Sequence, residues 1–208
     1  MIIAVDGPAA SGKGTITREL AAHFGLAWLD TGLLYRAVGV TVMRADGDPD
    51  DPETALAGCE FADSLLEDPE LRSERAGNYA SRVSVHPAVR AALIDRQKRF
   101  ASQPGGAVLD GRDIGTVIAP DADAKLFVTA SAEARADRRF ADEIKTNPDA
   151  DRDAILADIK TRDERDSERA SAPLKRAEDA DLLDTTNLTI SAAVQRAIAL
   201  VEARTGKR

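Results

Sequence analysis

The chain has 208 residues and a net charge of -8, with 43% hydrophobic and 31% charged residues. These proportions are typical of a soluble globular protein that can bury a core without disulfides or metals. One cysteine and two histidines exclude an internal disulfide and leave no zinc-binding spacing. The acidic balance argues against general nucleic-acid binding. No apolar run is long enough for a membrane span, and no signal peptide is recognisable, so we expect a cytoplasmic protein.

Apolar runs that alternate with helical patterns predict a three-layer α/β domain. We expect the strands of a parallel sheet at residues 2–5, 26–29, 107–109, 125–129 and 181–183. Amphipathic helices are predicted at 13–24, 88–100 and 190–203. Two polar segments interrupt the alternation. Residues 45–75 are expected to form a loop followed by irregular helix, and residues 140–153 an exposed connection between two charged helices.

A glycine-rich turn follows the first predicted strand and leads directly into the first predicted helix. Gly7, Gly12 and Lys13 match the spacing G-x-x-x-x-G-K of a phosphate-binding loop. Its backbone N–H groups and the helix N-terminus would hold the phosphates of a nucleoside triphosphate. Gly14 stands where GTPases carry Ser or Thr, and the hydroxyl follows at Thr15, as in the loops of nucleoside monophosphate kinases. The likeness to the loops of nucleoside monophosphate kinases implies that the triphosphate is ATP, bound by Gly7, Pro8, Ala9, Ala10, Ser11, Gly12, Lys13, Gly14 and Thr15.

Polar residues also follow the second and third predicted strands. Thr31 is placed to cap a helix, with Arg36 about one turn inside it. Asp110 ends the third strand, where an acidic residue would orient magnesium, directly or through water. Arg112 and Asp113 come next, at the carboxyl end of the sheet, where α/β domains place their ligands.

One predicted helical face changes from aliphatic to charged between residues 155 and 169. Ile155 and Ile159 share a face with Arg162, Asp166 and Arg169. If the isoleucines pack inward, the arginines face a cleft and need an anionic partner. The alternative is a solvated face on which Asp166 pairs with Arg162 and Arg169. This part of the chain holds further arginines, among them Arg135, Arg138 and Arg139. We expect a minority of all these arginines to contact phosphate and the others to be paired on the surface.

Five motifs together resemble the bacterial cytidylate kinases, which are P-loop nucleoside monophosphate kinases. They are DGPAASGKGT, LDTGLLYR, VHPAVRAAL, DGRDIGT and RDERDSERASAPL, in the order of that family. The resemblance implies a P-loop NTPase fold with a five-stranded parallel sheet, a helical monophosphate-binding region and a lid. It implies transfer of a phosphoryl group from ATP to CMP or dCMP, with Mg2+. No feature of the sequence separates CMP from dCMP.

The resemblance also assigns roles to individual residues. Substrate binding falls on Thr31, Arg36, Ser81, Arg90, Arg112, Asp113, Arg162, Asp166 and Arg169. Among these, Ser81, Arg90 and Asp113 would read the cytosine, and Arg162 and Asp166 would contact sugar and phosphate. The catalytic group would be Lys13, Arg112, Arg162 and Arg169, with Asp110 near the metal, through water.

The resemblance predicts one kinase domain over residues 1–208, with the monophosphate-binding region at 31–105 and the lid at 139–165. Residues 56–80 are too short for the three-stranded insertion that many bacterial members carry. A monomer that binds neither nucleic acid nor membrane is expected. Two alternatives stay open: a kinase of the same fold for UMP, AMP or a non-nucleotide acid, and a catalytically idle nucleotide-binding regulator.

Overall fold

The computed structural model describes residues 1–206, and its centre is a parallel sheet of five strands. The strands are β1 (Ile2–Asp6), β2 (Ala27–Asp30), β3 (Ala107–Gly111), β4 (Ala124–Thr129) and β5 (Asp181–Asp184), in the order β2-β3-β1-β4-β5. All neighbouring strands pair in parallel. The predicted α/β class and all five predicted strands are confirmed, each within a residue or two of its expected ends.

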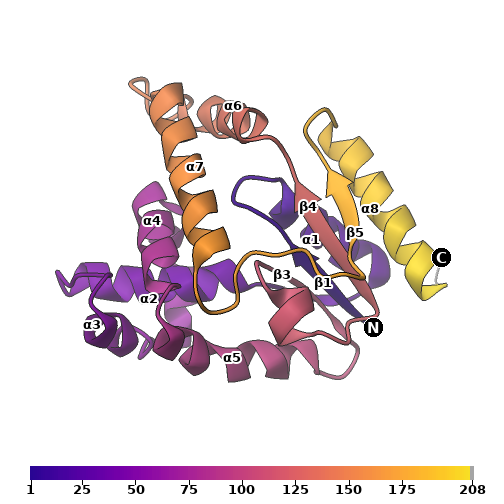
Figure 1. Cartoon of the computed structure of the whole chain (residues 1–208), viewed down its shortest axis with the longest axis horizontal. Coiled ribbons are helices and arrows are strands. Elements are labelled where there is room, and N and C mark those ends of the chain that lie inside the picture. The colour runs from indigo at the N-terminus through magenta and orange to yellow at the C-terminus, as the bar shows by residue number, and fades with distance from the viewer. Residues whose placement is uncertain (207–208) are drawn as a thin grey trace.

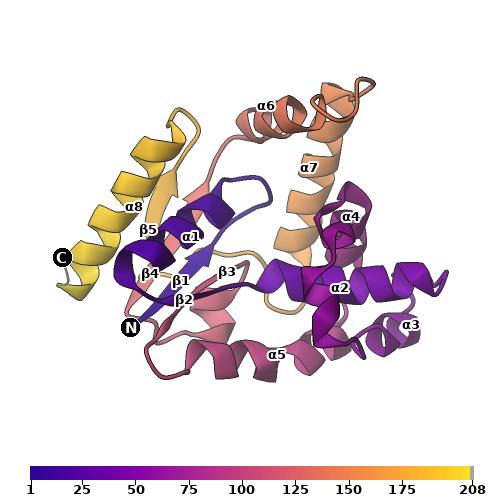
Figure 2. The same cartoon turned by 180° about the vertical axis from the view of Figure 1, so that it is seen from behind.

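Helices cover both faces of the sheet and leave the central strands buried (Figures 1 and 2). On one face, α1 (Lys13–Phe24) and α8 (Ile190–Thr205) pack against Ile3 and Val5 of β1. On the other face, α5 (Pro87–Ala101) and a π-helical turn, Ile114–Ile118, pack against Ala4. Successive residues of a strand point to opposite faces, so a central strand buried on both faces is apolar throughout.

The region between β2 and α5 is helical. It contains α2 (Thr31–Arg44), α3 (Pro52–Ala57), 3-10 turns at Asp63–Glu67 and Pro69–Arg72, and α4 (Glu74–Val83). Helices α2 and α4 cross closely, because a Cβ on Gly39 would lie only 2.8 Å from the Cβ of Tyr79. Residues 56–80 contain turns and part of α4 and no strand. The predicted loop and irregular helix at 45–75 match this arrangement.

Two consecutive helices, α6 (Ala132–Glu143) and α7 (Arg152–Glu168), pack against each other at a steep angle and extend beyond the carboxyl edge of the sheet (Figure 1). Ile155 and Ile159 of α7 pack on Ala136 of α6 in a small core of their own. The exposed connection is shorter than predicted, because α6 continues to Glu143 and only residues 144–151 lie between the helices. From α6, the pair reaches across the edge of the sheet to α2 and α4, where α7 ends (Figure 2).

Candidate active site

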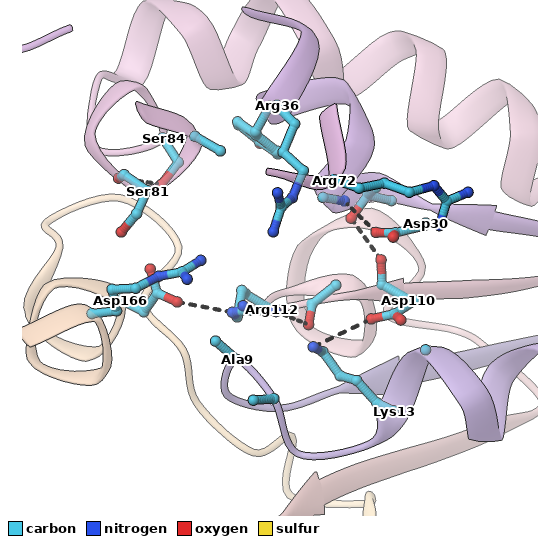
Figure 3. Close-up of a pocket in the computed structure, with 18 of the residues that line it drawn as sticks. Ala9, Lys13, Asp30, Arg36, Arg72, Ser81, Ser84, Asp110, Arg112 and Asp166 are labelled. Carbon is cyan, nitrogen blue, oxygen red and sulfur yellow. Dashed lines mark hydrogen bonds and ion pairs between the residues drawn. The ribbon is translucent and has the colours of Figure 1, made fainter. Parts of the chain in front are cut away.

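A cavity of about 730 Å³ lies between the carboxyl edge of the sheet, the α2–α4 region and the α6–α7 pair. Figure 3 shows Lys13, Asp30 and Asp110 on one side of it and Ser81, Ser84 and Asp166 on the other. Every predicted substrate-binding residue lines this cavity, as do four residues of the predicted phosphate loop. These are Thr31, Arg36, Ser81, Arg90, Arg112, Asp113, Arg162, Asp166 and Arg169, with Ala9, Ala10, Lys13 and Gly14.

The phosphate loop is shaped by close backbone packing at its start and by a left-handed turn at its end. A Cβ on Gly7 would lie 2.0 Å from the carbonyl oxygen of Val128, so only glycine fits there. Gly12, with φ of 87°, forms the N-cap of α1, and the helix then begins at Lys13. The first N–H groups of α1 are therefore open to an anion. Gly7, Pro8, Ser11, Gly12 and Thr15 shape or flank the loop without lining the cavity.

Lys13 lies beside Asp110 at the end of β3. Its Nζ is 3.5 Å from Asp110 Oδ1 and donates to the Pro8 carbonyl at 3.3 Å. Burial lowers the pKa of Lys13, and the positive charge of Arg112 lowers it further. Burial also raises the pKa of Asp110, opposed by Lys13. The buried pair thus places the Lys13 ammonium group and the Asp110 carboxylate together at the mouth of the phosphate loop.

The predicted cap of α2 is wrong by one residue. The N-cap is Asp30, whose Oδ1 accepts from the N–H of Gly32 at 2.9 Å. The Thr31 hydroxyl instead donates to the backbone carbonyl of Asp110 at 2.7 Å. Because β2 and β3 are adjacent, this bond joins the carboxyl ends of the two strands. Thr31 and Asp110 both line the cavity there.

Charged residues from three elements meet opposite the phosphate loop. Arg112, after β3, donates through Nε to Asp166 Oδ2 of α7 at 2.8 Å. Asp113 forms a buried ion pair with Arg90 of α5, and its other oxygen is 3.6 Å from Arg169 Nη2. Burial raises the pKa of Asp166, but attraction by Arg112 and the other arginines outweighs it and the net pKa is lowered. The predicted inward face of α7 is confirmed, and the solvated alternative is wrong.

Arg162 is the least compensated cation of this group. Its side chain is 11% exposed, and its one acidic neighbour within 4 Å among residues 1–206 is Asp158, at 3.9 Å. Burial, followed by repulsion from Arg112, lowers its pKa to about 10. Among the described residues, Arg162 Nε, Arg169 Nη2 and Arg90 Nη1 are buried without a hydrogen-bond acceptor. Such groups fit an anionic ligand in the cavity.

Residues 3–203, nearly the whole chain, match the family model described as cytidylate kinase. The chain belongs to the cytidylate kinase family. A cytidylate kinase of Xanthobacter autotrophicus is 57% identical over the full length of both chains, and one of Caulobacter sp. is 57% identical over 97% of this chain and 94% of its own. The predicted enzyme class, an ATP-dependent (d)CMP kinase, is confirmed.

A solved structure with the same fold is an uncharacterized protein from Eubacterium ventriosum. It has a TM-score of 0.58 and 14% identity over 98% of this chain and 99% of its own, which is a likeness of fold alone. Within residues 1–206, no helix of this cytidylate kinase family member combines the length and the apolar character needed to cross a bilayer.

The arginines of α6 are mostly engaged in ion pairs or bonds to the backbone. Arg135 is buried between Asp163 of α7, with Nη1–Oδ1 at 2.9 Å, and the Ala9 carbonyl of the phosphate loop, at 3.2 Å. Arg138 donates to Thr185, after β5. Only Arg139 of the three lines the cavity. Arg135 and Arg138 are thus engaged away from the cavity, as predicted, but the expected surface pairing is wrong for Arg135, whose ion pair is buried beneath the phosphate loop.

Some cavity residues of this family member were not predicted from the sequence. Asp30 could have been found by the rule that selected Asp110, because both are acidic residues at the carboxyl end of a strand. Tyr35 lies next to Arg36 within the quoted motif, and Arg90 lies over its ring at 5.6 Å. Arg72 and Ser84 had no sequence signal, since each reaches the cavity only through the packing of the α2–α4 region.

Proposed function

We propose that the protein transfers the γ-phosphoryl group of ATP to CMP or dCMP, giving ADP and CDP or dCDP. The observation that carries this proposal is one cavity in which a phosphate loop faces buried arginine N–H groups that have no acceptor among residues 1–206. A donor triphosphate and an acceptor phosphate would fill the two sides. Membership of the cytidylate kinase family supports cytosine as the base.

The donor would bind along Gly7–Thr15. Backbone N–H groups at the start of α1 would hold its phosphates, and Lys13, which lines the cavity, would contact the β and γ phosphates. The residues present also fit Mg2+, which prefers one or two carboxylates completed by phosphate oxygens and water. Asp110 supplies such a carboxylate beside Lys13, with Asp30 also in the cavity wall. Mg2+ would neutralise phosphate charge there.

The acceptor base would lie between α4 and the Arg90–Asp113 pair. Arg90 offers N–H donors and Asp113 a carboxylate acceptor, held side by side by their ion pair. Cytosine presents acceptors at N3 and O2 next to an amino donor, which complements this pair. Uracil carries a donor at N3 and an acceptor at O4, so it fits less well. Ser81 completes the group from α4.

The acceptor phosphate would lie among Arg36, Arg112, Arg162 and Arg169, with Thr31 beside it and Asp166 near the sugar. A phosphate oxygen is already ionised near neutral pH, so the acceptor needs no general base. The arginines and Lys13 would align the two phosphates and stabilise the charge on the transferring group. Residues 139–165 would act as the lid, which closes over the cavity and keeps water from competing as acceptor.

A coupled ADP-release assay with ATP and Mg2+ tests this function on CMP, dCMP, UMP, AMP and GMP. CMP and dCMP should give kcat/KM values at least tenfold above the others. A preference for UMP or AMP would favour another kinase of the same fold. ATP binding without ADP release on any acceptor would favour a regulator. Mg2+ dependence is tested in the same assay by adding EDTA.

Two further expectations stay predictions. A monomer should elute in size-exclusion chromatography near the chain mass of 22.2 kDa. Fractionation of the host cell should recover the protein with the cytoplasmic contents, where its nucleotide substrates are.

A further inference from the structure

One hydrogen bond joins helix α7 to the wall of the acceptor side. Arg165 Nη1 donates to Ser81 Oγ of α4 at 2.9 Å. Ser81 is 6% exposed and lines the cavity, next to Ser84 in Figure 3. Arg165 does not line the cavity, although Arg162 and Asp166 of the same helix do, as does Arg169 directly after it. It therefore approaches Ser81 from behind the wall.

Arg165 differs from most arginines of the α6–α7 pair in its partner and shares with Arg138 of α6 the lack of a carboxylate partner among residues 1–206. Arg135, Arg139 and Arg152 each pair with a carboxylate, namely Asp163, Asp158 and Asp137. Arg165 has no carboxylate within 4.0 Å among residues 1–206, and its hydrogen bond goes to the Ser81 hydroxyl. A half-buried guanidinium whose hydrogen bond goes to a neutral hydroxyl gains little stability compared with an ion pair. This points to a role in the site.

The bond restricts the Ser81 hydroxyl, which would otherwise rotate freely. Because one lone pair of Oγ accepts from Arg165, the hydroxyl hydrogen has to point away from α7. Among the described residues, Ser81 Oγ makes no other hydrogen bond. The hydrogen and the second lone pair are therefore available to a molecule in the cavity. A polar group held in advance in one orientation binds with a smaller loss of entropy.

We propose that Arg165 is a positioning residue for the acceptor nucleotide, which orients the Ser81 hydroxyl toward the base and couples base recognition to the docking of α7 on α4. The proposal rests on the proposed function, in which Ser81 faces the cytosine. A second bridge supports the docking, because Arg139 of α6 pairs with Glu74 of α4 at 2.6 Å. Recognition at Ser81 would then be complete only when the lid helix is in place.

The experiment is a double-mutant cycle between Arg165→Met and Ser81→Ala, read as kcat/KM for CMP and for UMP. Arg165→Met should raise KM for CMP about tenfold, as loss of a charged hydrogen bond does, change kcat less, and reduce the CMP preference over UMP. In Ser81→Ala the partner is already gone, so adding Arg165→Met should change the preference less than twofold. Arg165→Lys, which keeps a donor, should restore part of it.

Arg204→Met is the matched control, because it removes an arginine of α8, outside the lid, whose ion pair with Asp181 lies at the surface. It should leave KM and base preference unchanged. The proposal would be overturned if the effects of Arg165→Met and Ser81→Ala on the CMP preference multiply in the double variant. It would also be overturned if Arg165→Met leaves KM for CMP unchanged. If Arg165→Met does not fold, Arg165→Gln carries the same comparison. A wild-type protein without CMP preference would refute the proposed function instead, and the assay panel shows this separately.

Discussion

Replacing Arg162 by methionine should stabilise the ligand-free protein and at the same time remove most of its activity. Arg162 is mostly shielded from solvent near other arginines, and its pKa falls to about 10 through burial and repulsion by Arg112. At neutral pH the guanidinium is charged in both the folded and the unfolded chain. A lowered folded-state pKa therefore means that the charge destabilises the folded state at every pH below about 10.

The size of this effect follows from the pKa. The fall of the pKa from the ordinary guanidinium value to about 10 corresponds to roughly 3 kcal/mol. The side chain is 11% exposed, and water at the cavity mouth reduces the effect to about 2 kcal/mol. Methionine keeps much of the side-chain volume without the charge. For a chain of this length, ~2 kcal/mol raises Tm by roughly 4 to 8 °C.

The assay is thermal unfolding with and without CMP, together with the ADP-release rate. The variant should melt higher than the wild type without ligand, gain less from saturating CMP, and lose about a hundredfold or more in kcat/KM. Arg152→Met, with its exposed ion pair, should melt within about 2 °C of the wild type. A ligand-free Arg162→Met protein that melts lower than the wild type would refute the electrostatic reasoning.

Three further substitutions test other parts of the site. Lys13→Ala should lower kcat about a hundredfold or more in the ADP-release assay, with little change in CMP binding by calorimetry. Gly7→Ala places a methyl group 2.0 Å from the Val128 carbonyl oxygen and should lower the free energy of unfolding by about 3 kcal/mol in urea titrations. Burial raises the pKa of Asp6 to about 7, so the folded protein keeps a proton that the unfolded chain loses above its value of 3.8. Wild-type stability should therefore fall relative to Asp6→Asn by about 2 to 3 kcal/mol between pH 5 and 7, and level off above pH 7.

The sheet and the phosphate loop could be predicted because their signals are local. Each strand is a short apolar run, and parallel strands bring their carboxyl ends to one edge whatever their order. Asp110 and the segment after it could thus be placed beside the phosphate loop from sequence. The inward face of α7 also followed from spacing, since Ile155 and Ile159 show which side of the helix is buried.

The partners of the site residues could not be predicted in the same way. A helical spacing suggests pairing of Asp166 with Arg162, but Asp166 pairs with Arg112, which is 54 positions away. Arg165 and Ser81 are 84 positions apart and meet only because α7 docks on α4. The prediction that Thr31 caps α2 was wrong for a related reason. Thr31 and Asp30 are both good capping residues, and the choice depends on the bond from Thr31 to the neighbouring strand.

The arrangement of these pairs explains how an acidic chain can form an anion site. The net charge of -8 governs the surface, where carboxylates such as Asp137 and Glu74 neutralise arginines of α6 and α7 one by one. Inside the cavity the balance is reversed, because Arg162 has only a distant acidic neighbour and Arg169 keeps a buried N–H without an acceptor among the described residues. Buried charges are weakly screened, so this local excess determines which ligand binds. Because the surface carboxylates are paired with surface arginines, they do not neutralise the excess positive charge in the cavity. Binding of a dianionic phosphate would remove the destabilisation that this positive charge causes.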